Sequence, residues 1–197
     1  MRGHAVAATA LVLLVGGVSL QAQGHRVLLE LGPGTFSPDD PFKATLSLRG
    51  AVGWILNSRN AIAFDYTRQS ANRNEGPDLG RHARQFIGLA WQHAFRDAFG
   101  NEELLHQQYL LRLAGGVLTR GTFQGVQPSV ALKDAGFFDA GVSIRYPFTT
   151  HVAAVGMIED ALAFLPKQVI TSGSTAYDFG GKVQNNFGLF VLVQWRP

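Results

Sequence analysis

The feature of this chain that most constrains its fold is a two-residue alternation of apolar and polar side chains. Successive side chains of a β-strand point to opposite faces, so the alternation predicts strands with one apolar and one polar face. In Phe137–Phe148, for example, Phe138 and Ile144 alternate with Asp139 and Arg145. Eight segments are interpreted as strands: His25–Gly32, Thr45–Leu56, Ala61–Gln69, Gln85–Phe95, Leu105–Leu118, Phe137–Phe148, Val152–Phe164 and Val183–Trp195.

The weakest of the eight is Val152–Phe164. Whether its odd-numbered or its even-numbered residues form the apolar face, Glu159 or Asp160 falls on that face. Its Ala, Met and Leu content also suits a helix. We predict a strand with a bulge near Glu159, which would turn both acids away from lipid and keep the strand count even. A helix is the alternative.

The connections between these segments alternate strictly between long and short. The long ones are Pro33–Phe42, Ser70–Ala83, Thr119–Gly136 and Leu165–Lys182; the short ones are Asn57–Asn60, Asp97–Glu103 and Pro147–Thr150. Tight turns at one end and long loops at the other are typical of membrane barrels. The sequence therefore predicts an all-β protein: an eight-stranded antiparallel up-and-down transmembrane β-barrel.

The first 22 residues have a different character. Ala5–Val18 holds fourteen residues without charge after a short, weakly basic start, which is too short to cross a membrane, for which about 20 residues are needed. We interpret residues 1–22 as a cleaved secretory signal peptide and residues 23–197 as the barrel domain. Cleavage after Ser19 instead of Ala22 stays open, and a buried N-terminal helix is the alternative.

The polar face of the strands is small and carries ionic groups. These are Glu30, Arg49, Asp65, Arg84, Arg112, Asp139 and Arg145. A barrel of eight strands is only just wide enough to be filled by side chains, so we expect these groups to face the lumen, pair with one another and plug it. The apolar face is too bulky for that lumen, which indicates that it faces acyl chains.

Aromatic residues gather at the strand ends that border the short turns. They are Trp54, Trp91, Phe95, Tyr109, Tyr146, Phe148 and Trp195. In an up-and-down barrel these ends lie at one level, so the residues predict a girdle at a membrane interface. The alternative, that aromatic residues simply favour strands, explains their presence but not their shared level.

Together, the signal peptide, the eight segments and the final FGLFVLVQW resemble the small eight-stranded outer-membrane barrels of the OmpA, OmpX and opacity-protein type. The resemblance implies residence in the outer membrane, contact with its lipid and lipopolysaccharide, and assembly by the barrel-assembly machinery. In such families a terminal aromatic residue is thought to be read by that machinery, and Trp195, with Val193 two positions before it, fills the role. The chain departs from the pattern in Arg196 and Pro197, which follow the aromatic, and in Gly188, which lies further from the end than usual.

Residues for catalysis or cofactor binding do not form a recognisable pattern. His82, His93, His106 and His151 lack metal-ligand spacing, so we expect no metal and no cofactor. The absence of Cys excludes thiolate sites, and 17 basic against 14 acidic residues, without clustering, do not indicate nucleic-acid binding. Ser70, Asp78 and His82 could form a catalytic triple near the outer leaflet, but polar loop residues supply such triples by chance.

The remaining basic residues lie near the predicted outer rim. Candidate contacts for lipopolysaccharide phosphates are Arg68, Arg73, Arg81, Arg120, Lys133, Lys167 and Lys182, and a solvated rim is the alternative. We expect a monomeric, non-enzymatic outer-membrane protein that acts as envelope scaffold or surface-interaction protein through four long loops, whose ligand is unknown. The alternatives are a lipid A-modifying outer-membrane enzyme and a soluble carrier barrel of lipocalin type.

Overall fold

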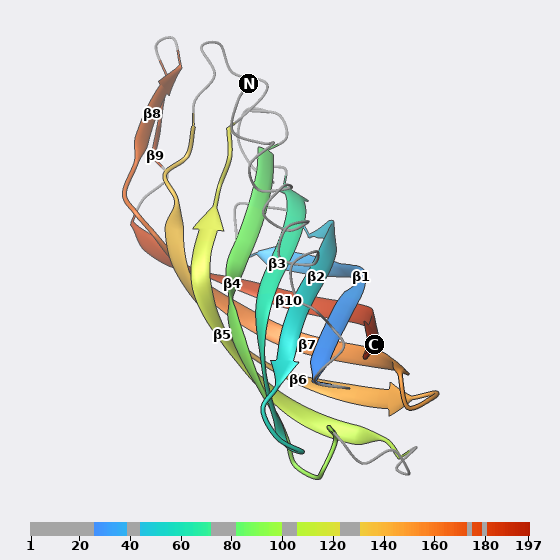
Figure 1. The fold of residues 1–197 in the computed structure, drawn as a ribbon. Coiled ribbons are helices and arrows are strands. Elements are labelled where there is room, and N and C mark those ends of the chain that lie inside the picture. The colour runs from blue at the N-terminus through green and yellow to red at the C-terminus, as the bar shows by residue number, and fades with distance from the viewer. Residues whose placement is uncertain are drawn as a thin grey trace.

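A computed structural model describes residues 26–38, 44–71, 82–99, 106–122, 131–172, 175–178 and 181–197 of the chain. Eight long strands form a closed antiparallel barrel in the order β1-β10-β7-β6-β5-β4-β3-β2 (Figure 1). They are β1 (Val27–Pro38), β2 (Thr45–Ile55), β3 (Asn60–Ala71), β4 (His82–Ala94), β5 (Gln108–Thr119), β6 (Ala135–Pro147), β7 (Val152–Leu165) and β10 (Lys182–Trp195). The predicted eight-stranded up-and-down barrel is confirmed. Within these described ranges, no helix has the length and apolar character needed to span a membrane.

The strand register sets the width of the barrel. Starting from Pro38, paired residues lead once around the ring and return to β1 at Leu28, ten residues earlier. The path runs through Asn186, Ala161, Asp139, Ala114, Ala90, Ala63 and Gly53. Eight strands with this ten-residue shear tilt by about 40° and enclose a space that side chains can fill completely.

The two ends of the barrel differ. The turn end carries the β2–β3, β4–β5 and β6–β7 connections, and the loop end carries the other four. At the turn end, Asn57 Oδ1 accepts the backbone N–H of Asn60 at 2.9 Å, which closes the β2–β3 turn. Asp97 joins this turn to the β4–β5 connection, and hydrogen bonds from Arg59 and Ser58 lower the pKa of its carboxyl.

The loop end carries more structure than the sequence predicted. Between β7 and β10 the chain forms a separate hairpin of β8 (Val169–Ser172) and β9 (Thr175–Asp178), which stands apart from the barrel wall in Figure 1. The first strand also runs to Pro38, whereas the sequence analysis ended it at Gly32. Both differences lengthen the β-structure towards the loop end.

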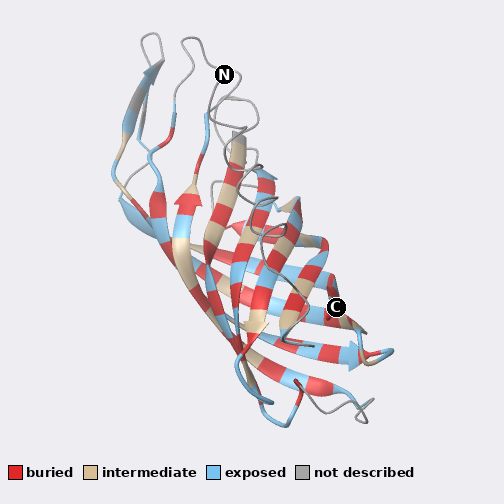
Figure 2. Cartoon of the chain, in the orientation of Figure 1, coloured by how far each residue is buried: buried red, intermediate tan, exposed pale blue. Residues whose placement is uncertain are grey.

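Buried and exposed residues alternate along the barrel strands (Figure 2). The outer wall is apolar, and Leu46 and Leu89 are 75% and 69% exposed there. The inward face holds ionic groups such as Arg49, which is only 2% exposed. The apolar surface is therefore on the outside, where a membrane barrel requires it.

The predicted bulge in the seventh segment is wrong. Pairing of β7 with both β6 and β10 runs without interruption across Glu159 and Asp160. A regular strand sends Glu159 into the lumen, where arginines bind it, and leaves Asp160 on the outer wall. A bulge is unnecessary because the inward acid is compensated inside the barrel.

We predict that Leu89→Arg lowers the free energy of unfolding from lipid vesicles by about 2–4 kcal/mol, because Leu89 faces the apolar exterior. The matched control is Ala90→Ser, on the lumen side of the same strand, which should cost far less. Chemical denaturation in vesicles measures both values. Equal costs would contradict the assignment of the two faces.

Candidate functional site

The middle of the lumen holds an ionic cluster formed by Arg49, Asp65, Arg112, Asp139 and Glu159. Arg49 donates to Asp65 at 2.7 Å and to Glu159 at 2.6 Å. Arg112 donates to Glu159 at 3.0 Å and also contacts Asp65 and Asp139. All five side chains are nearly inaccessible to solvent, so these charges are neutralised by one another.

Three of these five ion pairs join strands that are not neighbours in the wall. Arg49 comes from β2 and Glu159 from β7, so their contact crosses the lumen. Arg112 from β5 likewise reaches Asp65 on β3 and Glu159 on β7. The cluster therefore links opposite walls and fills the space between them.

Towards the turn end the lumen is filled by an amide cluster formed by Glu30, Gln92, Gln108, Arg145 and Gln194. Arg145 donates to the amide oxygens of Gln194 and Gln108, both at 2.6 Å. Gln194 in turn donates to Glu30 at 2.8 Å, and Gln92 donates to the same carboxylate at 3.3 Å. Amides therefore connect Glu30 to Arg145.

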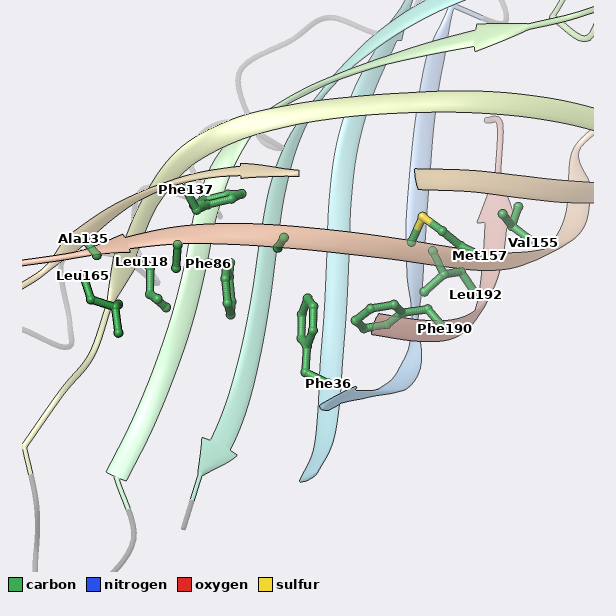
Figure 3. Packing of buried hydrophobic residues seen from close by; sticks show 12 residues of the cluster. Phe36, Phe86, Leu118, Ala135, Phe137, Val155, Met157, Leu165, Phe190 and Leu192 are labelled. Carbon is green, nitrogen blue, oxygen red and sulfur yellow. The ribbon is translucent and has the colours of Figure 1, made fainter. Parts of the chain in front are cut away.

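Towards the loop end an aromatic cluster of Phe36, Phe86, Phe137 and Phe190 closes the lumen (Figure 3). The rings of Phe36 and Phe86 stack at 4.9 Å, and edge contacts join them to the other two rings. Gly188 is required here, because a Cβ at this position would lie 2.9 Å from the rings of both Phe36 and Phe190.

Above the aromatic cluster, Arg84 lies over the Phe86 ring and donates to Gln184 at 2.9 Å and Asn186 at 3.0 Å. The cavity between the ionic and aromatic clusters measures only about 10 Å³. That volume holds about one water molecule, and no solute. In the part of the barrel that the structure describes, the lumen is thus filled at three levels.

The structure buries all seven ionic residues that the sequence assigned to the lumen. It does not join them in one network, since Glu30, Arg84 and Arg145 bind side-chain amides. Sequence reasoning missed the residues that complete the levels, which are Gln92, Gln108, Glu159, Gln184, Asn186 and Gln194. Their odd or even position in the strand indicates the inward face for all of them except Glu159, whose strand could be assigned either way.

The seven predicted interface aromatics lie on the outer wall towards the turn end. Trp54 is half-buried, and Trp91, Phe95, Tyr109, Tyr146, Phe148 and Trp195 are exposed. His93 lies among them, stacked on Trp91 and in edge contact with Phe95, and its Nδ1 is 2.9 Å from Asn60 Oδ1. This level is consistent with a membrane boundary.

One of the predicted rim contacts is wrong. Arg120 is 2% exposed and points into the lumen mouth, 3.5 Å from the Lys133 carbonyl, so it cannot reach lipid outside the barrel. Burial lowers the pKa of Arg120, and Asp134 opposes part of that shift. The other candidates divide into two groups. Arg68, Lys133, Lys167 and Lys182 are exposed, whereas Arg73 and Arg81 lie outside the described residues.

A side-chain clasp joins two connections at the loop end. Gln168 Oε1 accepts the backbone N–H of Lys133 at 2.8 Å, and Gln168 Nε2 donates to the Ala131 carbonyl at 2.9 Å. The β5–β6 connection is itself ribbon-like there, since Thr122 bridges Ala131. The amide of Gln168 therefore imitates a β-ladder and holds the β5–β6 and β7–β10 connections together.

The candidate chemistry of the sequence lies in separate places. His151 contacts the Arg196 carbonyl at the turn end, whereas the His82 backbone lies at the loop end. Asp78 of the suggested catalytic triple lies outside the described residues. Across the described ranges, no group of three or more metal-ligating side chains is placed to hold an ion.

A closed eight-stranded ring with an apolar outer wall and a lumen filled by ionic side chains defines the class: the chain has the fold of the small outer-membrane β-barrels. Solved structures agree. Neisserial surface protein A superposes with a TM-score of 0.59 at 15% identity, covering 89% of this chain and 98% of that one. OprG from Pseudomonas aeruginosa gives 0.62 at 11%, covering 88% and 98%. Ail, the attachment invasion locus protein of Yersinia pestis, gives 0.52 at 7%, covering 89% and 100%. No family model and no curated protein matches the chain.

We predict that Arg112→Met lowers the free energy of unfolding by about 3–5 kcal/mol, because it leaves buried acids without a cationic partner. Denaturant titration in vesicles measures the change. The control is Arg59→Met, which breaks an exposed pair with Asp97 and should cost far less. A small loss from the Arg112 variant would show that the ionic cluster does not stabilise the barrel.

We also predict that Gln168→Ala accelerates trypsin cleavage after Lys133 and Lys167 about twofold to tenfold, since it removes two hydrogen bonds that join the loops. Fragment analysis by mass spectrometry over time gives the rates. Gln107→Ala, an exposed change at the turn end, is the control and should leave them unaltered. Unchanged cleavage in both variants contradicts a clasp.

Proposed function

We propose that this protein resides in the outer membrane as a non-enzymatic barrel that acts as envelope scaffold or surface-interaction protein through its four loop-end connections. The observation that carries the proposal is the filled lumen beneath a structured loop end. A barrel whose described lumen has a cavity for about one water is suited to support and display, and unsuited to passage of solutes. The specific ligand of the loops follows from their own residues and not from the fold.

The comparison structures support this proposal. Two of them are named as a surface protein and an attachment protein, and this chain aligns with nearly the whole length of both. The exposed Lys133, Lys167 and Lys182 at the loop end suit lipopolysaccharide phosphates. Export by the segment 1–22 and assembly through Trp195 complete the proposed route to the membrane.

The two alternatives fare differently. A soluble carrier of lipocalin type needs an open apolar interior and a polar exterior, whereas the described lumen is filled by side chains and the outer wall is apolar, so that interpretation is wrong. A lipid A-modifying enzyme remains the competing class, although Asp78 of its suggested triple lies outside the described residues.

The proposal is tested by an epitope tag inserted between residues 173 and 174, in the sequence between β8 and β9. The matched control carries the same tag between residues 102 and 103, in the β4–β5 connection of the turn end. We expect the first tag to bind antibody on intact cells and the second only after the outer membrane is permeabilised. The reverse pattern, or recovery of the protein in the soluble periplasmic fraction, contradicts the proposal.

Mass spectrometry of lipid A separates the two classes. Cells with and without the gene should give the same acyl and phosphate pattern if the protein is not a lipid A enzyme. A changed pattern that also disappears with Ser70→Ala would establish the enzymatic alternative.

A further inference from the structure

Along the described barrel strands, the outer wall carries two charged side chains. Among the described residues of the eight barrel strands, every outward position is apolar or neutral except Arg68 on β3 and Asp160 on β7. Neither side chain makes a hydrogen bond or an ion pair within the described part of the chain, and the Oδ1 atom of Asp160 is buried without a partner. An ionic group facing lipid is unfavourable unless something outside the chain binds it.

Asp160 lies inside the apolar band and not beyond it. Along β7, its outward neighbours are Ile158 on one side and Leu162 on the other, which are 46% and 37% exposed. Across the sheet it pairs with Ala140 on β6 and Phe187 on β10. Asp160 is half-buried at this position, so the barrel does not enclose the whole residue.

The two charges lie on opposite walls. The strands β3 and β7 are four steps apart in a ring of eight, which places them diametrically across the barrel. One barrel therefore cannot bring its own Arg68 and Asp160 together.

The register also places both charges at the same height. From Asp160, paired residues lead through Ala140, Leu113 and Trp91 to Ile62 on β3. A full circuit along paired residues ends ten residues away from its starting height, so half a circuit ends five residues away. The position on β3 at the height of Asp160 is therefore about five residues from Ile62 towards the loop end. Arg68 lies six residues beyond Ile62, and the two charges thus differ in height by about one residue, or roughly 2.5 Å.

From this geometry we propose that a second copy of this chain docks against the barrel wall, with Arg68 of one copy bound to Asp160 of the next. Copies inserted in one orientation present their walls at equal heights, so translation in the membrane plane brings the two charges together. One contact then neutralises both side chains. The proposal replaces the sequence-based expectation of a monomer, and it rests on the proposed membrane location.

Lipopolysaccharide is the competing partner for Arg68. A phosphate group would neutralise Arg68, but as an anion it could not neutralise the carboxylate of Asp160 on the opposite wall. A second copy satisfies both charges with one interface. Because the two walls differ, the contact is head-to-tail and generates open rows in the membrane, and not closed pairs.

The test uses the absence of Cys from the chain. The test variant carries Leu162→Cys and Ser70→Cys, and both thiols lie on the outer wall. Each is two residues further towards the loop end than the nearby charge, Asp160 or Arg68, so the two thiols also lie at about the same height. They cannot meet within one barrel, so each disulfide reports a contact between copies. We expect a ladder of dimers, trimers and larger species on non-reducing gels after mild oxidation, in membranes and in phosphatidylcholine vesicles.

Charge variants of the Leu162→Cys/Ser70→Cys protein test whether Arg68 and Asp160 hold the copies together. We expect Asp160→Asn or Arg68→Gln to reduce the ladder at least fivefold, and Asp160→Arg/Arg68→Asp together to restore it. The matched control is Leu31→Cys/Leu113→Cys, on the opposite walls β1 and β5, where no charges face each other; it should give only the random background. Circular dichroism verifies that each variant is folded.

Three outcomes overturn the proposal: a ladder no stronger than the control, a ladder that survives loss of Asp160, or a ladder that requires lipopolysaccharide. The last outcome assigns Arg68 to lipid phosphate. Membrane fractionation of the same samples shows separately whether the protein is in the outer membrane, so a failure of the docking contact is distinguishable from a failure of the proposed function.

Discussion

Closure of eight strands with a ten-residue shear leaves a lumen that only side chains can fill, and the other features of this barrel depend on that constraint. Charged groups that point inward are cut off from water, so each requires a partner from another strand. Arg49 reaches across to Glu159, and Arg112 reaches both Asp65 and Glu159. The narrowness of the barrel thus forces the cross-wall contacts that fill its centre.

The filled centre has consequences for the two ends. The ionic, amide and aromatic clusters lie at successive levels, so deformation of one wall is transmitted to the opposite wall through direct contacts. A rigid barrel wall fixes the positions of the strand ends from which the loop-end connections start. The Gln168 clasp and the β8–β9 hairpin add order above that base, which is where variation in function can occur without change in the barrel.

Much of this arrangement follows from local pattern. Parity in the strands was enough to place Arg49 and Arg112 inside, and to place Leu89 outside, because a regular strand fixes the face of each residue. Parity cannot tell which inward groups bind each other, since that depends on the shear. It was ambiguous for Glu159 and Asp160, and the register resolved it. Arg120 has the same inward parity as Arg112 and turns into the lumen mouth, but the sequence placed it on the rim because the predicted strand ended at Leu118.

The two adjacent acids of β7 are physically linked by that same parity. A regular strand that delivers Glu159 to Arg49 and Arg112 must turn residue 160 to the lipid side. The ionic cluster therefore accounts for the outward direction of this position but not for its charge, because Ala or Asn at 160 would leave the contacts of Glu159 unaltered. On a wall that is otherwise apolar or neutral along the described strands, the carboxylate has to be explained by something outside the barrel. The equal height of Arg68 on the far wall makes another copy of the same surface the simplest source of a counter-charge.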